Sequence, residues 1–451
     1  MTELACFVPC PRGLEDVLVE ELGDELVNQL GERATAGVRA TAGGVHFAGS
    51  WIDVYRVNLY SRIASRVLVR IAHDRYRSED DIYRLVLAQD WVRWFDADQT
   101  LRVDVTAGSG KSKSGLRSLE FVTLRVKDGI CDRFRNAVGK RPSIDTRSPD
   151  VRVFAYLDAT TCTLYLDTSG EPLFKRGWRI EAGEAPLREN LAAGILRLAG
   201  WKPGIALLDP MCGSGSFVVE AAQTIFGIAP GAARRFGFER LKNFDEAAWT
   251  RLKESASPRV SVQADSAARL LRASDVSGDA VTLTRANLER AGIGSDIAQV
   301  IAAKQIDARQ VKPHADTGIV VANPPYGARI GIRGERASQL RDSAHDAAHG
   351  DARSHQRRGD QDDADVDSAL TDFFVEFGNA LKQRFAGWTC HILTSDMNLQ
   401  RKLRLSPDRR VPLFNGAIEC RLYRFALVAG QHGRNAERPK SSTVSGASGG
   451  E

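Results

Sequence analysis

The chain has 451 residues, of which 43% are hydrophobic and 26% are charged, and its formal net charge is +5. This length and apolar content predict two or three domains with packed cores. No stretch is uncharged over the length that spans a membrane, and the start, Met1–Cys6, lacks the basic and apolar regions of a secretory signal, so we expect a cytoplasmic protein that is not membrane-bound. The seven cysteines are scattered without a Cys-x-x-Cys pair, which favours reduced buried thiols over disulfides or a zinc site.

The first 167 residues predict an α+β region. Leu14, Val17, Leu18 and Leu22 have helical spacing, and a strand pair is expected around Gly43–Phe47. Farther along, the pattern predicts a strand-like segment at 61–72, a helix at 79–87, a strand at 101–106, a helix at 121–134 with Leu124 and Ile130 facing inward, and a hairpin of 151–158 with 162–167.

Residues 101–141 carry ten Lys or Arg against four Asp or Glu. A local cationic excess suits a polyanion such as RNA, and Lys111, Lys113 and Arg117 are candidate phosphate contacts. The alternative interpretation is an ordinary solvated face.

Residues 168–184 are polar and contain glycine, which predicts a linker, and residues 185–429 alternate strands and helices as a parallel α/β sheet requires. There, an apolar run meets Asp209 and the turn Pro210-Met211-Cys212-Gly213-Ser214-Gly215 before a helix begins. The glycines let the backbone approach a ligand closely, and the helix N-terminus offers free N–H groups to a carboxylate. Because no Gly-Lys-Ser/Thr follows, this turn is not a phosphate-binding loop of the P-loop type.

A second motif, Asn323-Pro324-Pro325-Tyr326, follows the apolar strand at 318–322. The Asn323 oxygen and the Pro324 carbonyl can both accept hydrogen bonds from one exocyclic amine, and the Tyr326 ring can stack on the base that carries it. Each motif alone has an ordinary explanation, because Gly-x-Gly turns are common and X-Pro pairs end elements in any loop. Their occurrence together, in this order and each after an apolar strand, predicts a methyltransferase that alkylates a nucleobase amino group.

Two further segments predict no packed structure. Residues 336–367 are expected to form a disordered insertion, since no large aliphatic or aromatic residue occurs between Leu340 and Val366, and the Ser/Gly-rich tail at 430–451 is expected to be disordered too. Three histidines stand in the insertion among acids (His345, His349 and His355), so metal binding there is an alternative to a solvated segment, but we predict no metal site.

From the N-terminus to about residue 428, the chain resembles the bacterial THUMP-domain 23S rRNA guanine-N2-methyltransferases, in the half of those enzymes that methylates a guanine amino group. The resemblance rests on blocks in fixed order, among them Gly43–Phe47, Ser61–Arg66, Arg176–Arg179, Ala185–Leu187, Leu207–Phe217 and Val321–Gly327. It implies a ferredoxin-like region at 1–60, a THUMP RNA-binding domain at 61–167, and a Rossmann-like class I methyltransferase domain at 185–429 that uses S-adenosylmethionine.

The chain departs from the family pattern in three respects. The low-complexity insertion after Tyr326 is not part of that pattern. In some relatives a second methyltransferase, which makes 7-methylguanine, follows in the same polypeptide, and we expect this chain to end before one could fit. Relatives commonly show Lys-Glu-Thr after Pro-Leu, where this chain has Arg188-Glu189-Asn190.

The resemblance also implies roles for the site residues. Asp209 opens the cofactor turn, whose residues wrap the methionine part of the cofactor (Pro210, Cys212, Gly213, Ser214 and Gly215). Asp275 accepts hydrogen bonds from the ribose hydroxyls, with a helix N-cap or a surface acid as the alternative. Asp307 is at the expected place for a contact to the adenine amino group, but the flanking loops differ in length from those of the family, so a neighbouring residue is the alternative. Asn323, Pro324 and Tyr326 hold a base flipped out of the RNA, and Pro325 stiffens their loop.

The implied substrate is the N2 amine of a guanine in 23S rRNA, on naked RNA or an early assembly intermediate, with no obligate protein partner. A tRNA guanine-N2-methyltransferase is the nearest alternative, since THUMP modules also serve tRNA enzymes. An adenine-N6 enzyme or a glutamine-amide enzyme would use the same tetrapeptide. An RNA-binding or assembly protein that has lost catalysis is the remaining alternative.

Overall fold

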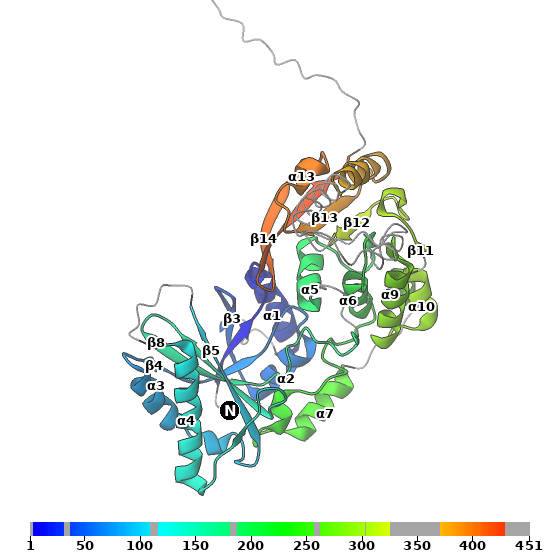
Figure 1. Ribbon diagram of the computed structural model, residues 1–451. Helices are drawn as coiled ribbons and strands as arrows, with labels where there is room; N and C mark the ends of the chain where they lie inside the picture. Colours follow the sequence, from blue (N-terminus) through cyan, green and yellow to red (C-terminus); the bar gives the residue numbers. More distant parts are fainter. Residues whose placement is uncertain are drawn as a thin grey trace, which may run out of the picture.

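The computed structural model describes residues 3–30, 37–108, 116–180, 187–256, 262–302, 304–324 and 370–428. These residues form two β-sheets with helices packed on them, one in the N-terminal half and one in the C-terminal half (Figure 1). Within these ranges, every helix is too short or too polar to cross a bilayer.

The N-terminal sheet has eight strands in the order β2-β3-β1-β4-β8-β7-β5-β6. Its strands are β1 (Leu4–Pro9), β2 (Arg39–Thr41), β3 (Gly44–Gly49), β4 (Leu68–Arg75), β5 (Thr100–Ala107), β6 (Ser143–Ile144), β7 (Val151–Leu157) and β8 (Thr161–Asp167). β5 runs parallel to β6 and β7, and the other pairs are antiparallel. The hairpin predicted at 151–167 is therefore confirmed as β7 and β8.

The N-terminal helices are α1 (Glu15–Leu30), α2 (Trp51–Tyr60), α3 (Glu79–Leu87) and α4 (Leu119–Val138), with a 3₁₀ turn, η2, at Trp91–Arg93. Two of them begin at reciprocal caps, in which a serine hydroxyl accepts from the backbone N–H three residues on and an aspartate accepts from the serine N–H. Ser50 and Asp53 cap α2, and Ser78 and Asp81 cap α3. The predicted helix at 79–87 is thus confirmed to the residue.

Two details of the sequence-based prediction are wrong. The strand expected at 61–72 begins only at Leu68, because the Glu21 carboxylate accepts hydrogen bonds from Ser61 Oγ, Arg62 N and Ile63 N and holds that backbone out of a sheet. Leu124 is 50% exposed instead of facing inward. The buried face of α4 contains Val122 and Val126, and a residue two positions from each lies on the opposite side of a helix with 3.6 residues per turn.

The C-terminal sheet has seven strands in the order β11-β10-β9-β12-β13-β15-β14. Its strands are β9 (Ala206–Asp209), β10 (Leu271–Asp275), β11 (Lys304–Gln305), β12 (Gly318–Ala322), β13 (Thr389–Thr394), β14 (Arg409–Asn415) and β15 (Ile418–Ala426). All neighbours from β11 to β13 are parallel, whereas β15 runs antiparallel to both β13 and β14. The chain leaves β9 on one side toward β10 and returns on the other side as β12, which makes the β9–β12 boundary a topological switch point.

The accompanying helices are α5 (Glu189–Leu198), α6 (Ser216–Ile225), α7 (Glu246–Ser255), α8 (Val262–Ala268), α9 (Gly278–Arg290), α10 (Ser295–Ile301) and α13 (Leu399–Lys402), with helical residues at 370–384 and 3₁₀ turns η3 (Gly237–Arg240) and η4 (Ala308–Gln310). The seven cysteines are all buried free thiols, as predicted from their scatter.

One apolar core runs through both halves of the chain. Leu14, just before α1, lies so close to Gly194 of α5 that a Cβ at position 194 would be 2.3 Å from the Leu14 Cδ1 atom. At the other end of the junction, β14 extends toward the N-terminal half (Figure 1), and the Arg12 guanidinium lies 4.6 Å from the centre of the Phe414 ring. The two sheets are therefore packed against each other through α1, α5 and the β14–β15 hairpin.

Candidate cofactor and catalytic site

Three of the predicted site residues lie at the carboxyl ends of adjacent parallel strands. Asp209 ends β9, Asp275 ends β10 and Asn323 directly follows β12. Asp209 is in register with Ala273 of β10, and Leu208 is in register with Val320 of β12. The sheet therefore brings these side chains to one edge at its topological switch point, where open α/β sheets bind ligands.

The turn from Asp209 to α6 requires glycine at two positions for different reasons. Gly213 has a φ of 53° and Gly215 a φ of 82°, in the left-handed region. A Cβ at Gly215 would lie 2.7 Å from the Thr284 Cγ2 atom, so the protein's own packing excludes a side chain there. A Cβ at Gly213 would meet no atom of the described residues within 4 Å, so this position faces space that a ligand can enter.

Helix α9 holds the carbonyls of the turn from behind. Thr284 Oγ1 donates to the Gly213 carbonyl (2.9 Å), and Asn287 Nδ2 donates to the Ser214 carbonyl (2.8 Å). Both side chains are fully buried. Neither residue was predicted from the sequence, although their three-residue spacing on the helix that follows Asp275 places them on one face.

Cys212 contributes a backbone contact and a buried thiol to the turn. Its N–H donates to the Ser274 carbonyl (3.0 Å), and its Sγ lies 3.4 Å from Thr284 Oγ1. Burial is the main cause that raises the pKa of the Cys212 thiol well above its usual value, so the group is neutral. It packs the turn and is not a nucleophile.

Asp275 braces the same turn from the neighbouring strand. Its Oδ2 accepts from Gly213 N (3.0 Å) and its Oδ1 from Ser277 N (3.0 Å). The N-cap of α9 is Ser277, whose hydroxyl accepts from Ala280 N, so the N-cap alternative for Asp275 does not hold. The adjacent Val276 is 60% exposed and offers an apolar surface at this edge that the sequence analysis missed.

Asp209 is a buried carboxylic acid, and few polar groups compensate for its loss of contact with water. Its Oδ1 accepts from Met211 N (3.3 Å), and no ion pair reaches it within the described ranges. Burial raises the pKa of Asp209 well above its usual value, and the negative charge of Asp275 raises it further. An ammonium group brought beside this carboxyl would favour its ionised form. The residues therefore fit the methionine end of S-adenosylmethionine, which carries such a group.

Asp307 lies next to the same sheet edge but already has partners. Its Oδ1 accepts from Arg309 N (2.8 Å), and both of its oxygens bind the Arg309 guanidinium, with Oδ2 2.6 Å from Nη2. Hydrogen bonds from the Arg309 side chain are the main cause that lowers the pKa of Asp307. An adenine contact through Asp307 stays a prediction that would require sharing these acceptors.

Asn323 is half-buried, and its side-chain Oδ1 is buried without a hydrogen-bond partner among the described residues. A buried acceptor left unpaired costs about 1–3 kcal/mol, and such groups in native proteins call for an explanation. Pro324 is buried beside it, whereas Pro325 and Tyr326 lie outside the described residues. Asn323 Oδ1 is thus an acceptor without a partner among the described residues, at the end of the strand next to β9.

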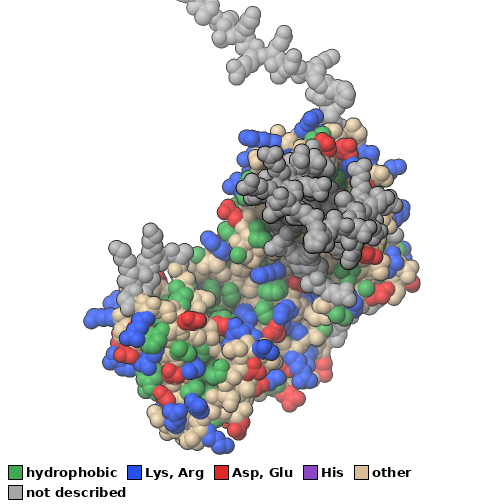
Figure 2. Space-filling view, in the orientation of Figure 1, with side chains coloured by type: hydrophobic (Ala, Val, Ile, Leu, Met, Phe, Trp, Pro, Cys, Tyr) green, Lys and Arg blue, Asp and Glu red, His purple; other side chains and the backbone are tan. Residues whose placement is uncertain are grey.

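Most cations of the predicted RNA-binding segment are paired with acidic side chains in the structure. Arg102, Arg125, Lys127, Arg133, Arg135 and Lys140 each pair with an aspartate. Arg117 stacks its guanidinium 4.9 Å from the centre of the Phe121 ring, and Lys111 and Lys113 lie outside the described residues. The solvated-face alternative therefore explains much of the charge excess, and Figure 2 shows Lys and Arg side chains scattered among acids over this half.

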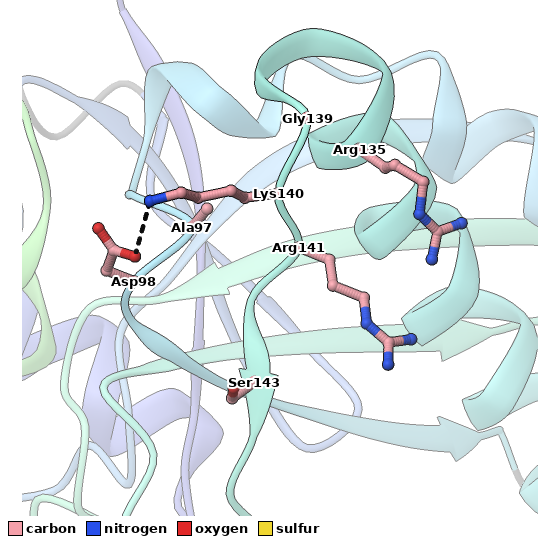
Figure 3. Close-up of a pocket in the computed structure, with 7 residues that line it drawn as sticks. All are labelled: Ala97, Asp98, Arg135, Gly139, Lys140, Arg141 and Ser143. Carbon is pink, nitrogen blue, oxygen red and sulfur yellow. Dashed lines mark ion pairs between the residues drawn. The ribbon is translucent and has the colours of Figure 1, made fainter.

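A hollow of about 470 Å³ lies at the C-terminal end of α4. Arg135, Lys140 and Arg141 line it, and Lys140 Nζ lies 3.7 Å from Asp98 Oδ1 (Figure 3). Arg141 has no ion pair with a described residue. The hollow is a polar, cationic surface of the N-terminal half that could contact a phosphate.

Three family profiles match consecutive parts of the chain. They are the RlmL ferredoxin-like domain at residues 5–68, the THUMP domain at 76–167 and the RMKL-like methyltransferase domain at 176–358.

Individual relatives match nearly the whole chain. The "Ribosomal RNA large subunit methyltransferase K/L" of Psychromonas ingrahamii is 34% identical over 94% of this chain and 50% of its own length. The "Putative RNA methyltransferase slr0064" of Synechocystis is 31% identical over 93% of this chain and 96% of its own length. The chain thus spans about half the length of the K/L relatives and nearly all of the Synechocystis protein.

Among solved structures, SMU.472, titled a putative methyltransferase complexed with SAH, superposes with a TM-score of 0.72. It is 26% identical, and the superposition covers 96% of this chain and 100% of that chain.

Proposed function

Because the chain belongs to the family of THUMP-domain RNA methyltransferases, we propose that it transfers the methyl group of S-adenosylmethionine to the exocyclic N2 amine of a guanine in 23S ribosomal RNA. The observation that carries the choice of an amine is Asn323. Its buried Oδ1 has no partner among the described residues and stands beside the cofactor turn, where an amine donor would satisfy it.

The chemistry of an exocyclic amine explains why the enzyme needs acceptors more than a strong base. Bound S-adenosylmethionine supplies a methyl group on a sulfonium, so the leaving group is a neutral thioether. The amine is a poor nucleophile because its lone pair is delocalised into the base. Asn323 Oδ1 and the Pro324 carbonyl would accept its two hydrogens, hold them out of the ring plane and return electron density to the nitrogen.

On the cofactor side, each carboxylate has a distinct task in this proposal. Asp209 would hold the α-ammonium group, since it is buried and no cation pairs with it in the described part of the chain. Asp275 would accept from the ribose hydroxyls through the lone pairs left over from its two backbone contacts. Val276 would pack its exposed side chain against the adenine ring.

The choice of substrate rests on the N-terminal half and on the names of relatives. A THUMP module precedes the catalytic half, and the K/L relatives are named for ribosomal RNA of the large subunit. A base within folded RNA cannot reach a site at the edge of the sheet while it is stacked, so it must flip out. We therefore propose naked or early-assembling 23S rRNA as the substrate.

The test incubates the full chain and labelled cofactor with protein-free 23S rRNA, with tRNA and with mature ribosomes, followed by nucleoside mass spectrometry. We expect N2-methylguanosine in protein-free 23S rRNA. Label chiefly in tRNA would establish the tRNA guanine-N2 alternative, and N6-methyladenosine would overturn the choice of base. Binding of the demethylated cofactor, SAH, without label in any RNA would favour an RNA-binding protein that has lost catalysis.

A further inference from the structure

The segment Arg176–Arg179 connects the two halves. It makes two sets of contacts that lead to the cofactor turn and a third that joins α6 to the N-terminal half. It contains no helix or strand, yet Arg176 and Trp178 are buried and Arg179 is half-buried. The segment was predicted to be part of a linker. Its contacts are those of a packed element.

The first contact comes from Arg179. Its Nη2 donates to Ser216 Oγ (2.7 Å), and Ser216 is the first residue of α6, directly after Gly215. Ser216 Oγ in turn donates to the Leu187 carbonyl (3.0 Å), so both hydrogen-bonding roles of this hydroxyl are in use. Arg179 Nε lies 3.0 Å from Glu189 Oε1 in an ion pair, with the two side chains 11% and 7% exposed.

The second contact reaches the turn through two side chains. The Trp178 carbonyl accepts from Arg290 Nε (3.0 Å), and Arg290 Nη2 donates to Asn287 Oδ1 (2.6 Å). Asn287 then donates from Nδ2 to the Ser214 carbonyl (2.8 Å). The amide of Asn287 is thereby fixed in orientation on both of its polar atoms.

The third contact ties the segment to the N-terminal half. Arg176 Nε lies 3.2 Å from Glu220 Oε1 on α6, and its Nη2 donates to the Arg62 carbonyl. Arg62 Nη1 lies 3.2 Å from the other Glu220 oxygen. One buried carboxylate on α6 thus joins a cation of each half, so α6 cannot shift without disturbing both.

From these contacts we infer that Arg179 is a positioning residue for S-adenosylmethionine: by holding Ser216 it fixes the start of α6 and the turn Gly213–Gly215 from the linker side. The residue does not touch the cofactor itself in this proposal. It acts through Ser216, and the Trp178–Arg290–Asn287 chain supports the opposite side of the same turn. The inference rests on the cofactor and not on which RNA base is methylated.

Contact with RNA is an alternative role for Arg179, and the experiment must distinguish it from positioning of the cofactor turn. It also lines a groove of about 860 Å³ together with Arg188, Arg234, Arg235, Phe174 and Ile418, and a cation in a groove could contact RNA. A residue that contacts RNA would change the KM for RNA, whereas a positioning residue for the turn changes affinity for the cofactor.

The experiment measures SAH binding by calorimetry in the full chain and in Arg179→Met, Ser216→Ala and the double variant. A lost hydrogen bond from a charged donor predicts roughly tenfold weaker SAH binding for either single variant. The double variant should be weaker by less than the sum of the two single effects, because both substitutions remove the Arg179–Ser216 hydrogen bond. Backbone amides of 213–217 should exchange faster with solvent, and the KM for RNA should not change. Arg188→Ala is the matched control: its guanidinium lines the same groove, stacks on Phe174 at 4.9 Å and has no contact with the turn, so SAH affinity should be unchanged.

Arg179→Met also strips Glu189 of its cation, so it can lose stability for that reason alone. Ser216→Ala leaves that ion pair intact and decides the matter if the arginine variant folds poorly. Normal SAH affinity and normal amide exchange in Ser216→Ala would overturn the proposal. A raised KM for RNA with normal SAH affinity in Arg179→Met would overturn it as well, and would assign Arg179 to the RNA groove.

Discussion

Substituting Asn323 by alanine should separate catalysis from stability. In most buried asparagines the amide is bonded on both sides, so removal costs folding energy. Asn323 differs, because its Oδ1 has no partner among the described residues. Within the described part of the chain, no bond compensates the desolvation cost of that oxygen, about 1–3 kcal/mol. We therefore expect Asn323→Ala to change the free energy of unfolding by no more than about 1 kcal/mol, the lost desolvation cost offsetting the lost packing.

The effect on turnover should be far larger. Loss of one hydrogen-bond partner positioned for the transition state typically lowers kcat by about 10²–10³-fold, or roughly 3–4 kcal/mol. Asn58 provides the matched control, since it is a buried asparagine with all its bonds made: Nδ2 donates to the Val54 carbonyl and to Thr168 Oγ1, and Oδ1 accepts from Ser169 Oγ. Asn58→Ala should lower the free energy of unfolding by about 2–3 kcal/mol and leave kcat unchanged in the folded fraction.

The assay compares denaturant unfolding, SAH binding and single-turnover methylation of RNA for the two variants. Normal SAH affinity with slow methylation is expected for Asn323→Ala. Near-normal single-turnover rates in that variant would refute the role of the amide as an acceptor for the amine. A loss of stability as large as that of Asn58→Ala would show that Asn323 holds the fold instead.

Three further outcomes are expected. Burial raises the pKa of Asp209, so the folded state binds more protons than the unfolded state between the ordinary and the raised pKa, and this contribution to stability falls as pH rises through that window. SAH binding, which favours the ionised form, should release a proton there, as calorimetry in buffers of different ionisation heat would detect, and Asp209→Asn should abolish the release. Gly215→Ala should lower Tm more than Gly213→Ala, because a Cβ at position 215 would lie against Thr284, whereas Gly213→Ala should act mainly on SAH affinity, because its Cβ would enter the space left for the ligand; equal losses of Tm would contradict this packing argument. Arg117→Glu should weaken RNA binding at all sequences and reduce its salt dependence without changing the methylated base, and an unchanged salt slope in filter binding would remove Arg117 from the phosphate contacts.

The fold was predictable where local chemistry and the global structure agree. The apolar run before Asp209 and the glycines after it predict a strand, a turn and a helix, and β9 and α6 follow that order. The reduced cysteines and the hairpin at 151–167 were predictable for the same reason, because composition and alternation are local properties.

The contacts that needed tertiary structure were not predictable. Nothing local at Ser61 reveals that Glu21, forty positions earlier, accepts three hydrogen bonds from that segment and delays the strand. The Arg179–Ser216 contact bridges 37 positions and carries no sequence pattern of its own.

The packing of Leu14 on Gly194 has a consequence for chimeric enzymes. A side chain larger than hydrogen at position 194 would collide with Leu14. The glycine in helix α5 therefore leaves the space that the Leu14 side chain, just before α1, occupies. Because the core is continuous across this contact, heating should melt both halves in one cooperative transition. An N-terminal half taken from a relative would therefore need a side chain that fits against Gly194 of α5. A cut in the connecting segment would separate two surfaces that pack against each other.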